Sequence, residues 1–198
     1  MSRIITINRE FGSGGRELGK RLADALGVPC YDHEIIELIA KDNGFDEQYV
    51  ANVSETSIEA AYPLTIGHRF AMPVLPVMEQ PIRVAVAQRK ILENFAEKGD
   101  CVIVGRCANY VLRDRDDVLD IFIHAGVAYR LNRAITSLGL SEKQAKKVLR
   151  STDKARKAYY KNYTGTDWND PDLYHACLNP DRYSIEGCVK LICDMYRS

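Results

Sequence analysis

The sequence lacks an excess of either charge. Its 198 residues include 27 lysines and arginines and 27 aspartates and glutamates, so the formal net charge is zero. A balanced chain gives no electrostatic reason to expect a nucleic acid or an anionic membrane surface as a partner. Runs near the 18 or so apolar residues that span a bilayer are also missing, and the first ten residues turn polar too early for a signal peptide. We therefore predict a cytoplasmic protein that binds neither nucleic acid nor membranes.

Closely spaced cysteine pairs are missing as well. The six cysteines are scattered and form no C-x-x-C pair, which argues against a zinc site and against a disulfide framework. Four of them stand within apolar runs, where a reduced cysteine behaves as a small hydrophobic residue: Cys101, Cys177, Cys188 and Cys193.

The remaining composition is that of an ordinary globular protein. Apolar residues make up 46% of the chain and charged residues 27%, values typical of a packed domain. The length suits one α/β domain with a small insertion, so we predict a single domain over residues 1–198. Strand-like apolar runs alternate with helical periodicity, without internal repeats or low-complexity tracts.

The most informative stretch is residues 4–22, IITINREFGSGGRELGKRL. Its β-branched apolar start predicts a strand buried on both faces, and the helix that follows begins near Arg16. Between them, the glycines allow the backbone to turn several N–H groups toward one point at the positive end of the helix dipole. This arrangement predicts an anion site with these candidate residues: Gly12, Ser13, Gly14, Gly15, Arg16 and Glu17.

The loop lacks three of the four residues that define a P-loop, G-x-x-x-x-G-K-[ST]. With Gly14 at the second glycine, Gly15 holds the lysine position, Arg16 the hydroxyl position and Arg9 the first glycine position. Arg16 could reach the phosphates as a bidentate fork in place of the lysine. The alternative is an ordinary tight turn with solvated arginines, and the flanking strand and helix favour the phosphate interpretation.

Asp32 follows a short predicted strand over residues 28–31. A carboxylate at the C-terminal end of a parallel strand lies where open α/β sheets bind ligands, so Asp32 could hold Mg²⁺ or accept a proton from a substrate hydroxyl. It could equally be the N-cap of the next helix, predicted over residues 34–40, and the cap is the favoured interpretation.

Residues 42–80 are punctuated by glycines and prolines and read as an insertion over the sheet. Within the proline-rich segment 63–81, the stretch FAMPVLPVM (residues 70–78) is predicted to be neither helix nor central strand. It could line a pocket or a partner surface, and packing against the core or as a lid over it is the favoured interpretation. Helical periodicity returns over residues 82–96, where Arg83 and Gln88 are candidates to face a cleft.

Arg106 follows the best candidate for a second central strand, residues 101–104. An arginine at that edge can grip a second phosphate bidentately, although a surface arginine on a turn is the alternative. Further strands are predicted over residues 119–124 and 174–178, with helices over 127–137, 141–160 and 184–196.

In this order, the segments resemble the cytidylate kinase-like branch of the P-loop nucleoside monophosphate kinases over nearly the whole chain. The resemblance rests on the stretches ITINREFGSGGRELGKRLADALG, CYDHEII, the helix with Gln88 and Arg89, VIVGRCANYVL, LDIFIHAGVAYRLNRAI and DKARKAYYKNYTGTDW. It implies a three-layer α/β/α sandwich of the P-loop kinase type around a central parallel sheet. It also implies an inserted acceptor-binding segment over residues 42–98 and a helical lid over residues 130–165.

The resemblance also implies roles for individual residues, with ATP and Mg²⁺ as cofactors and a small nucleotide as substrate. The backbone of residues 12–16 would hold the ATP phosphates, and Arg106 falls on the arginine of a G-R-D motif that contacts the acceptor phosphate. Arg130 and Arg133 begin the helix that leads to the lid. The expected catalytic residues are Arg16, Arg106, Arg150 and Arg156; the expected substrate-binding residues are Asp32, Arg83, Gln88, Arg106 and Asp153.

Two departures from the family pattern bear on function. The loop lysine and hydroxyl are absent, and Cys107 stands where cytidylate kinases have the aspartate associated with reading cytosine. The leading hypothesis is an ATP-dependent kinase of a nucleoside monophosphate or a related small acceptor. The alternatives are a non-catalytic nucleotide-binding regulator and a kinase of a non-nucleotide metabolite, for which Asp32 would be the base.

Overall fold

The computed structural model describes residues 3–32, 34–44, 46–47, 50 and 76–198. Its strands are β1 (Ile4–Arg9), β2 (Cys30–Tyr31), β3 (Cys101–Val104), β4 (Val118–Ile123) and β5 (Ala176–Leu178). Its helices are α1 (Gly15–Leu26), α2 (Glu34–Asn43), α4 (Pro76–Glu97), α5 (Ala108–Val111), α6 (Val127–Thr136), α7 (Glu142–Thr164) and α8 (Pro180–Arg197), with a 3₁₀ turn at Pro171–Leu173.

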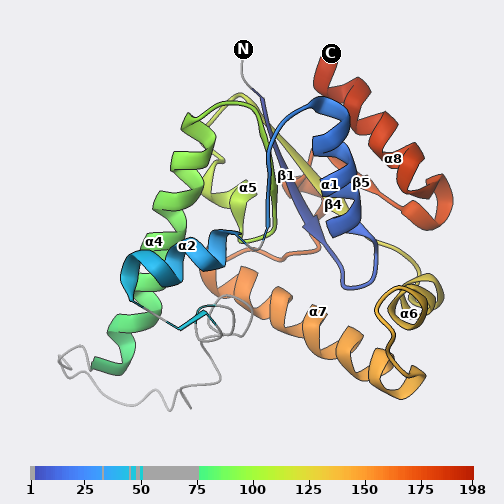
Figure 1. Ribbon diagram of the computed structural model, residues 1–198, viewed down its shortest axis with the longest axis horizontal. Helices are drawn as coiled ribbons and strands as arrows, with labels where there is room; N and C mark the ends of the chain where they lie inside the picture. The colour runs from blue at the N-terminus through green and yellow to red at the C-terminus, as the bar shows by residue number, and fades with distance from the viewer. Residues whose placement is uncertain (1–2, 33, 45, 48–49, 51–75) are drawn as a thin grey trace.

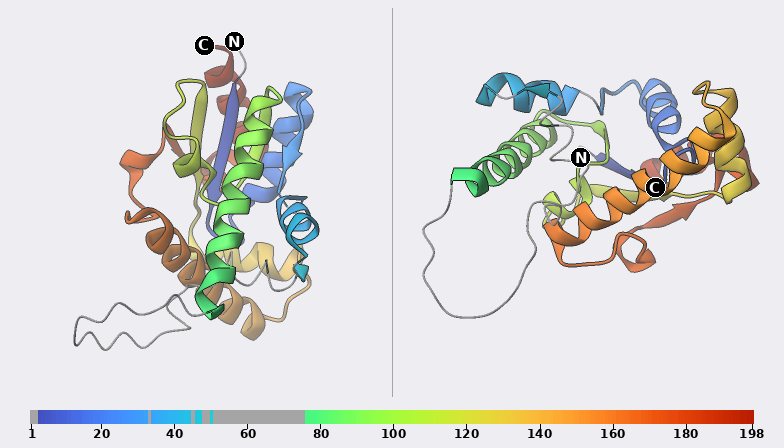
Figure 2. Two further views of the ribbon diagram at one scale, coloured as in Figure 1. Left: turned by 90° about the vertical axis from the view of Figure 1, so that its left-hand side faces the viewer. Right: turned by 90° about the horizontal axis from the view of Figure 1, so that it is seen from below.

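The strands form one parallel sheet in the order β2-β3-β1-β4-β5. Helices α1 and α8 cover one face, while α2, α4 and α5 cover the other (Figures 1 and 2). The predicted three-layer α/β/α sandwich with a central parallel sheet is therefore confirmed. Helix α7 lies across the end of the sheet where β1 and β3 finish (Figure 1), which is where parallel sheets bind ligands.

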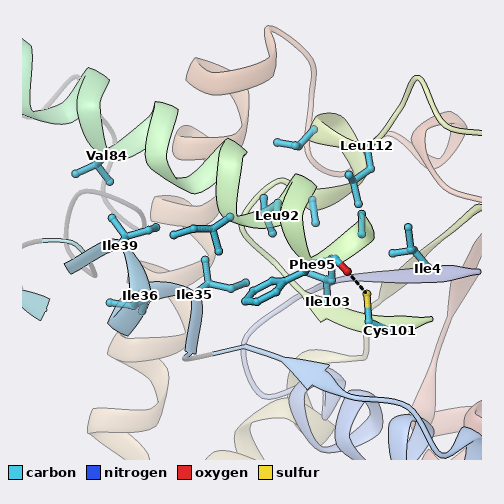
Figure 3. Packing of buried hydrophobic residues seen from close by; sticks show 14 of the residues in the cluster. Ile4, Ile35, Ile36, Ile39, Val84, Leu92, Phe95, Cys101, Ile103 and Leu112 are labelled. Carbon is cyan, nitrogen blue, oxygen red and sulfur yellow. Dashed lines mark hydrogen bonds between the residues drawn. The ribbon is translucent and has the colours of Figure 1, made fainter. Parts of the chain in front are cut away.

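The alternation of side chains along β1 divides the core into two clusters. Ile5 and Ile7 pack toward α1 and α8, whereas Ile4 packs toward α2 and α4. In this second cluster the thiol of Cys101 lies 3.9 Å from the carbonyl oxygen of Phe95 (Figure 3). All three isoleucines are fully buried, as expected for a strand covered on both faces.

Two helices begin several residues earlier than the sequence predicts. Helix α4 begins at Pro76, so residues 76–81 are helical although they were expected to be irregular. A proline is tolerated at the first helical position because that N–H has no partner within the helix. Helix α8 begins at Pro180 after an Asn179 cap, and Ser184 interrupts it with φ 58°. The helix that was predicted to start at residue 184 therefore corresponds to the part of α8 that follows this interruption. The predictions for residues 63–75 lie outside the described residues, as do parts of the predicted insertion 42–98.

All six cysteines are free. Cys101, Cys188 and Cys193 are buried, as expected for small hydrophobic residues. Cys177, which we grouped with them, is exposed on the edge strand β5, because its side chain falls on the uncovered side of that short strand. Within the described residues, no helix is long and apolar enough to cross a bilayer.

Candidate active site

The glycine loop joins β1 to α1 in the strand, turn and helix order that the sequence predicts. Gly14 caps α1 with φ 90°, and the Ser13 hydroxyl donates a 2.9 Å hydrogen bond to the Glu10 carbonyl. Gly12 has φ 76°, and a Cβ there would lie 2.7 Å from the Arg130 carbonyl oxygen, so a larger residue does not fit. The loop is thus set tightly against the start of α6, with the N-terminal end of a 12-residue helix at its far side.

Arg16 and Asp32 form an ion pair at the outer side of this loop. The Arg16 Nε lies 2.6 Å from Asp32 Oδ2, and the Arg16 side chain is 72% exposed. Asp32 also lies 3.5 Å from Arg9. The Asp32 carboxylate thus contacts two guanidinium groups. Its capping interpretation stays a prediction, because residue 33, between Asp32 and the first residue of α2, lies outside the described residues.

Three arginines from three separate elements line one small cavity of about 30 Å³. Arg9 ends β1, Arg106 follows β3 and Arg156 comes from α7. The Arg156 Nη1 donates a 3.1 Å hydrogen bond to the Arg9 carbonyl, which fixes α7 against the end of β1. Three cations that converge at the carboxyl edge of a parallel sheet create a strongly positive potential, which favours an anion.

Arg106 lies in an unusual turn. Gly105, Arg106 and Cys107 all have left-handed backbone, with φ of 82°, 56° and 54°. For a residue with a Cβ this conformation costs about 1 to 2 kcal/mol, so the surroundings must hold it. The Gln88 amide does so by donating a 3.0 Å hydrogen bond to the Arg106 carbonyl, and Gln88 in turn accepts from the Tyr159 hydroxyl at 3.3 Å. The turn therefore aims Arg106 into the cavity.

Gln88 differs in position from what helical periodicity indicates. We expected Gln88 to face a cleft, but it is fully buried under the Arg106 turn. Arg83, from the same helix, is exposed and lines a separate hollow of about 540 Å³ along α4. The structure therefore does not bring Arg83 together with the other candidate residues, and it gives Gln88 a positioning role.

Asp153 ties the loop to helix α7, which falls within the predicted lid region. Its Oδ1 accepts a 2.7 Å hydrogen bond from the Phe11 amide, and its Oδ2 lies 2.5 Å from Arg130. Arg130 is buried and also lies 3.4 Å from Glu10, whereas Arg133 pairs with Glu17 at 2.6 Å. Asp153 and Glu17, expected at the substrate and the cofactor, are thus engaged in holding the loop.

Arg150 does not join this group. It is exposed on α7, and it lies six positions before Arg156, which turns the two side chains to different sides of the helix. Of the two lid arginines predicted to act on the phosphoryl group, only Arg156 reaches the cavity.

The remaining wall of the cavity is polar and aromatic. Asn8, Cys107, Tyr159, Tyr160 and Trp168 complete its lining. The Asn8 amide donates to Asn109, whose amide donates to the Tyr160 hydroxyl, at 2.9 and 2.8 Å. Burial raises the pKa of the Cys107 thiol and of the Tyr159 hydroxyl, so both groups are neutral at physiological pH.

Sequence reasoning missed the aromatic wall, although the stretch DKARKAYYKNYTGTDW carries most of it. The adjacent tyrosines 159 and 160 continue the buried stripe of α7 that Ala145 and Leu149 begin, and this periodicity could have indicated their burial. Within the parts of the chain that the structure describes, no three His, Cys, Asp or Glu side chains gather as a metal site.

Solved structures share this fold. A shikimate kinase from Bacteroides thetaiotaomicron superimposes with a TM-score of 0.56 at 14% identity, with all of both chains covered. An uncharacterised protein from Eubacterium ventriosum is more similar, with a TM-score of 0.75 at 26% identity over all of this chain and 99% of the other. These likenesses show that the chain has a parallel α/β/α sandwich fold, which the shikimate kinase shares.

The chain belongs to the cytidylate kinase-like family, whose model matches residues 4–182. A cytidylate kinase from Pyrococcus horikoshii is 25% identical over 96% of this chain and 85% of that protein. One from Aeropyrum pernix is also 25% identical, over 91% of each chain. The resemblance noted from the sequence motifs is confirmed.

Proposed function

We propose that this protein is a phosphotransferase that moves the terminal phosphoryl group of ATP to a nucleoside monophosphate or a similar small phosphorylated acceptor. The observation that carries this proposal is the convergence of Arg9, Arg106 and Arg156 on one cavity beside the glycine loop. Family membership and kinase-fold neighbours support the same reaction class. Phosphoryl transfer needs positioning and charge neutralisation more than covalent help from the protein, and arginines supply both.

Each part of the site has a role in this proposal. The loop backbone and the start of α1 bind the ATP phosphates. Arg106 holds the acceptor phosphate as a bidentate fork, and Arg156 brings charge from the lid helix to the transferred group. Mg²⁺, which proteins commonly hold through one or two carboxylates together with substrate phosphates, would bind the Asp32 carboxylate at the end of β2 in exchange for its ion pairs with Arg9 and Arg16. When bound, the metal neutralises phosphate charge.

Cys107 bears on the choice of acceptor. It occupies the place of the family's cytosine-associated aspartate, and it is buried with a neutral thiol. A thiol is a weak hydrogen-bond partner and cannot replace a carboxylate in reading an amino group on a base. We therefore expect an acceptor other than cytidine monophosphate to give the highest kcat/KM.

A coupled assay for ADP formation with Mg-ATP and each nucleoside monophosphate in turn tests the proposal. We expect turnover with at least one acceptor above the rate of ATP hydrolysis alone. The alternative of a non-catalytic nucleotide sensor is favoured by the absent loop lysine, and it predicts thermal stabilisation by ATP without ADP formation. A result with neither turnover nor ATP binding would reject both.

If turnover appears only with sugar, amino-acid or cofactor precursors, the metabolite-kinase alternative holds, and Asp32→Asn should then lower kcat far more than it raises KM.

A further inference from the structure

The two loop positions that depart most from the P-loop pattern depart in opposite directions. The first glycine position holds Arg9, and the lysine position holds Gly15. One position has gained a long cationic side chain and the other has lost one. In the structure, side chains at these two positions would compete for the same space.

Arg9 occupies the space that a side chain at position 15 would need. A Cβ added to Gly15 would lie 2.5 Å from the Cβ of Arg9 and 2.9 Å from its Cγ. Real Cβ atoms do not approach other atoms so closely, and the Arg9 Cβ cannot move away without moving β1. A lysine at position 15 is therefore incompatible with Arg9 in its present place.

The guanidinium end of the Arg9 side chain extends toward β3 and lies directly against a second glycine, Gly105. A Cβ added to Gly105 would lie 1.9 Å from the Arg9 Nη1 and 3.0 Å from its Cζ. The side chain thus runs through a slot whose walls are two glycines, one at the start of α1 and one directly after β3. This slot places the guanidinium beside the turn that carries Arg106.

Arg9 is better placed than Arg16 to act on a phosphate. Its side chain is 16% exposed and lines the cavity, whereas that of Arg16 is 72% exposed and pairs with Asp32 at the outer side of the loop. A charge in a water-poor site stabilises a neighbouring anion far more than a solvated one does. The Arg156 hydrogen bond to the Arg9 carbonyl also joins the lid to the same residue.

We propose that Arg9 supplies the positive charge that the lysine supplies in a P-loop, reaching the transferring phosphoryl group through the slot between Gly15 and Gly105. This inference rests on the proposed function, and it assigns to Arg9 the role that the sequence alone suggested for Arg16. Asp32, which faces both arginines, holds Arg9 near the cavity before the nucleotide binds.

Paired substitutions test the assignment. Arg9→Met keeps most of the side-chain volume and removes the charge, and Arg16→Met is the matched control on the same loop. Because loss of a preorganised charge at the transition state lowers kcat by about 100-fold or more, we expect that loss for Arg9→Met and less than about 10-fold for Arg16→Met. Melting temperatures report whether each variant folds. Equal losses, or a larger loss for Arg16→Met, would overturn the proposal.

A reciprocal exchange provides a second test that does not depend on Arg9→Met folding well. Arg9→Gly should lose activity because the positive charge is removed. Gly15→Lys should lose activity because the lysine collides with Arg9. The double variant Arg9→Gly/Gly15→Lys has room for the lysine and should recover at least about 10-fold in kcat over Arg9→Gly. A folded double variant that recovers nothing would show that Arg9 does not replace the lysine.

Thermal stabilisation by ATP or by inorganic triphosphate separates this inference from the proposed function. We expect wild type to be stabilised by both compounds and Arg9→Met to lose most of the shift that Arg16→Met retains. If wild type transfers phosphate and Arg9→Met behaves as wild type, the inference fails while the proposed function stands. If wild type neither binds these compounds nor turns over, both fail.

Discussion

At the scale of single residues, Arg106 shows how backbone conformation and chemistry are linked. It lies in a left-handed turn that Gln88 and Tyr159 hold from below, and it directs its guanidinium into the cavity shared with Arg9 and Arg156. Uncommon backbone conformations, which cost free energy, are typical of binding and catalytic sites. Such placement orients the guanidinium group for bidentate hydrogen bonding, which a charge alone does not require.

Arg106→Lys is therefore expected to weaken binding of the acceptor although the charge is kept. A lysine cannot form the bidentate pair, and loss of one charge-assisted hydrogen bond costs about 1.5 to 3 kcal/mol, so KM for the acceptor should rise by about 10-fold to 100-fold. Steady-state kinetics with the preferred acceptor measure this. Arg113→Lys, at an exposed arginine stacked on Tyr110, is the control and should leave KM unchanged. An unchanged KM for Arg106→Lys would remove Arg106 from the acceptor site.

At the scale of elements, helix α1 lies unusually close to the sheet at Gly19. A Cβ there would lie 2.8 Å from Val104 Cγ2 and 3.3 Å from Ile7 Cδ1. Gly19→Ala should lower the free energy of unfolding by about 1 to 3 kcal/mol, because overpacking outweighs the better helix propensity of alanine. Urea denaturation measures the change.

Gly187 in α8 is the matched control, since its nearest neighbours to an added Cβ are 3.5 Å or more away. Gly187→Ala should raise the free energy of unfolding by up to about 1 kcal/mol through helix propensity alone. The same sign for both variants would contradict the close packing of α1 on β1 and β3.

The attachment of α7 to the glycine loop gives a second prediction at this scale. Asp153→Asn keeps an acceptor for the Phe11 amide and removes the negative charge beside the buried Arg130. Breaking a buried ion pair costs about 3 to 5 kcal/mol, and Arg130 keeps Glu10, so we expect a loss near the lower end, about 3 kcal/mol in urea denaturation.

Asp167→Asn breaks the exposed pair with Lys157, one turn along the same helix from Asp153, and should leave the urea midpoint unchanged. If both variants have the midpoint of wild type, Asp153 does not anchor helix α7 to the loop.

The elements themselves were the part of the structure that the sequence could predict. The apolar runs of β1 and β3 and the glycine turn depend on local patterns, so they were found with their order and approximate bounds. The burial of Gln88 depends on which element packs where, and a single-helix pattern does not contain that information. The separation of Arg150 from Arg156 follows from their spacing on one helix and could have been predicted. The route of Arg9 between two glycines joins residues 9, 15 and 105, and only the packed structure brings them together.

At the scale of the whole molecule, the aromatic cluster beneath α7 should make stability depend on alkaline pH. Burial raises the pKa of Tyr160 and of Tyr163 to about 12, from an ordinary value of 10.0. Above about pH 10 the unfolded chain loses protons that the folded protein keeps, so the stability from these groups is complete below pH 10 and is lost as pH rises toward 12.

Melting temperatures followed by circular dichroism from neutral pH upward should therefore fall steeply past about pH 10. Tyr163→Phe keeps the ring contacts with Tyr110 and Tyr159 and removes one titrating hydroxyl. Its melting temperature should therefore fall less steeply with rising pH than that of wild type. Tyr183→Phe, at a tyrosine that is 59% exposed, is the control. A slope that is the same in wild type and Tyr163→Phe would exclude Tyr163 from this effect.

The slot that holds Arg9 also limits how this loop can change by mutation. From the present sequence, a lysine at position 15 collides with Arg9, and a glycine at position 9 leaves the site without that charge. The two single substitutions that lead toward a P-loop are thus each expected to be harmful, and only both together are acceptable. Two loops that meet the same electrostatic need are in this way separated by a fitness valley, and each tends to persist within its own lineage.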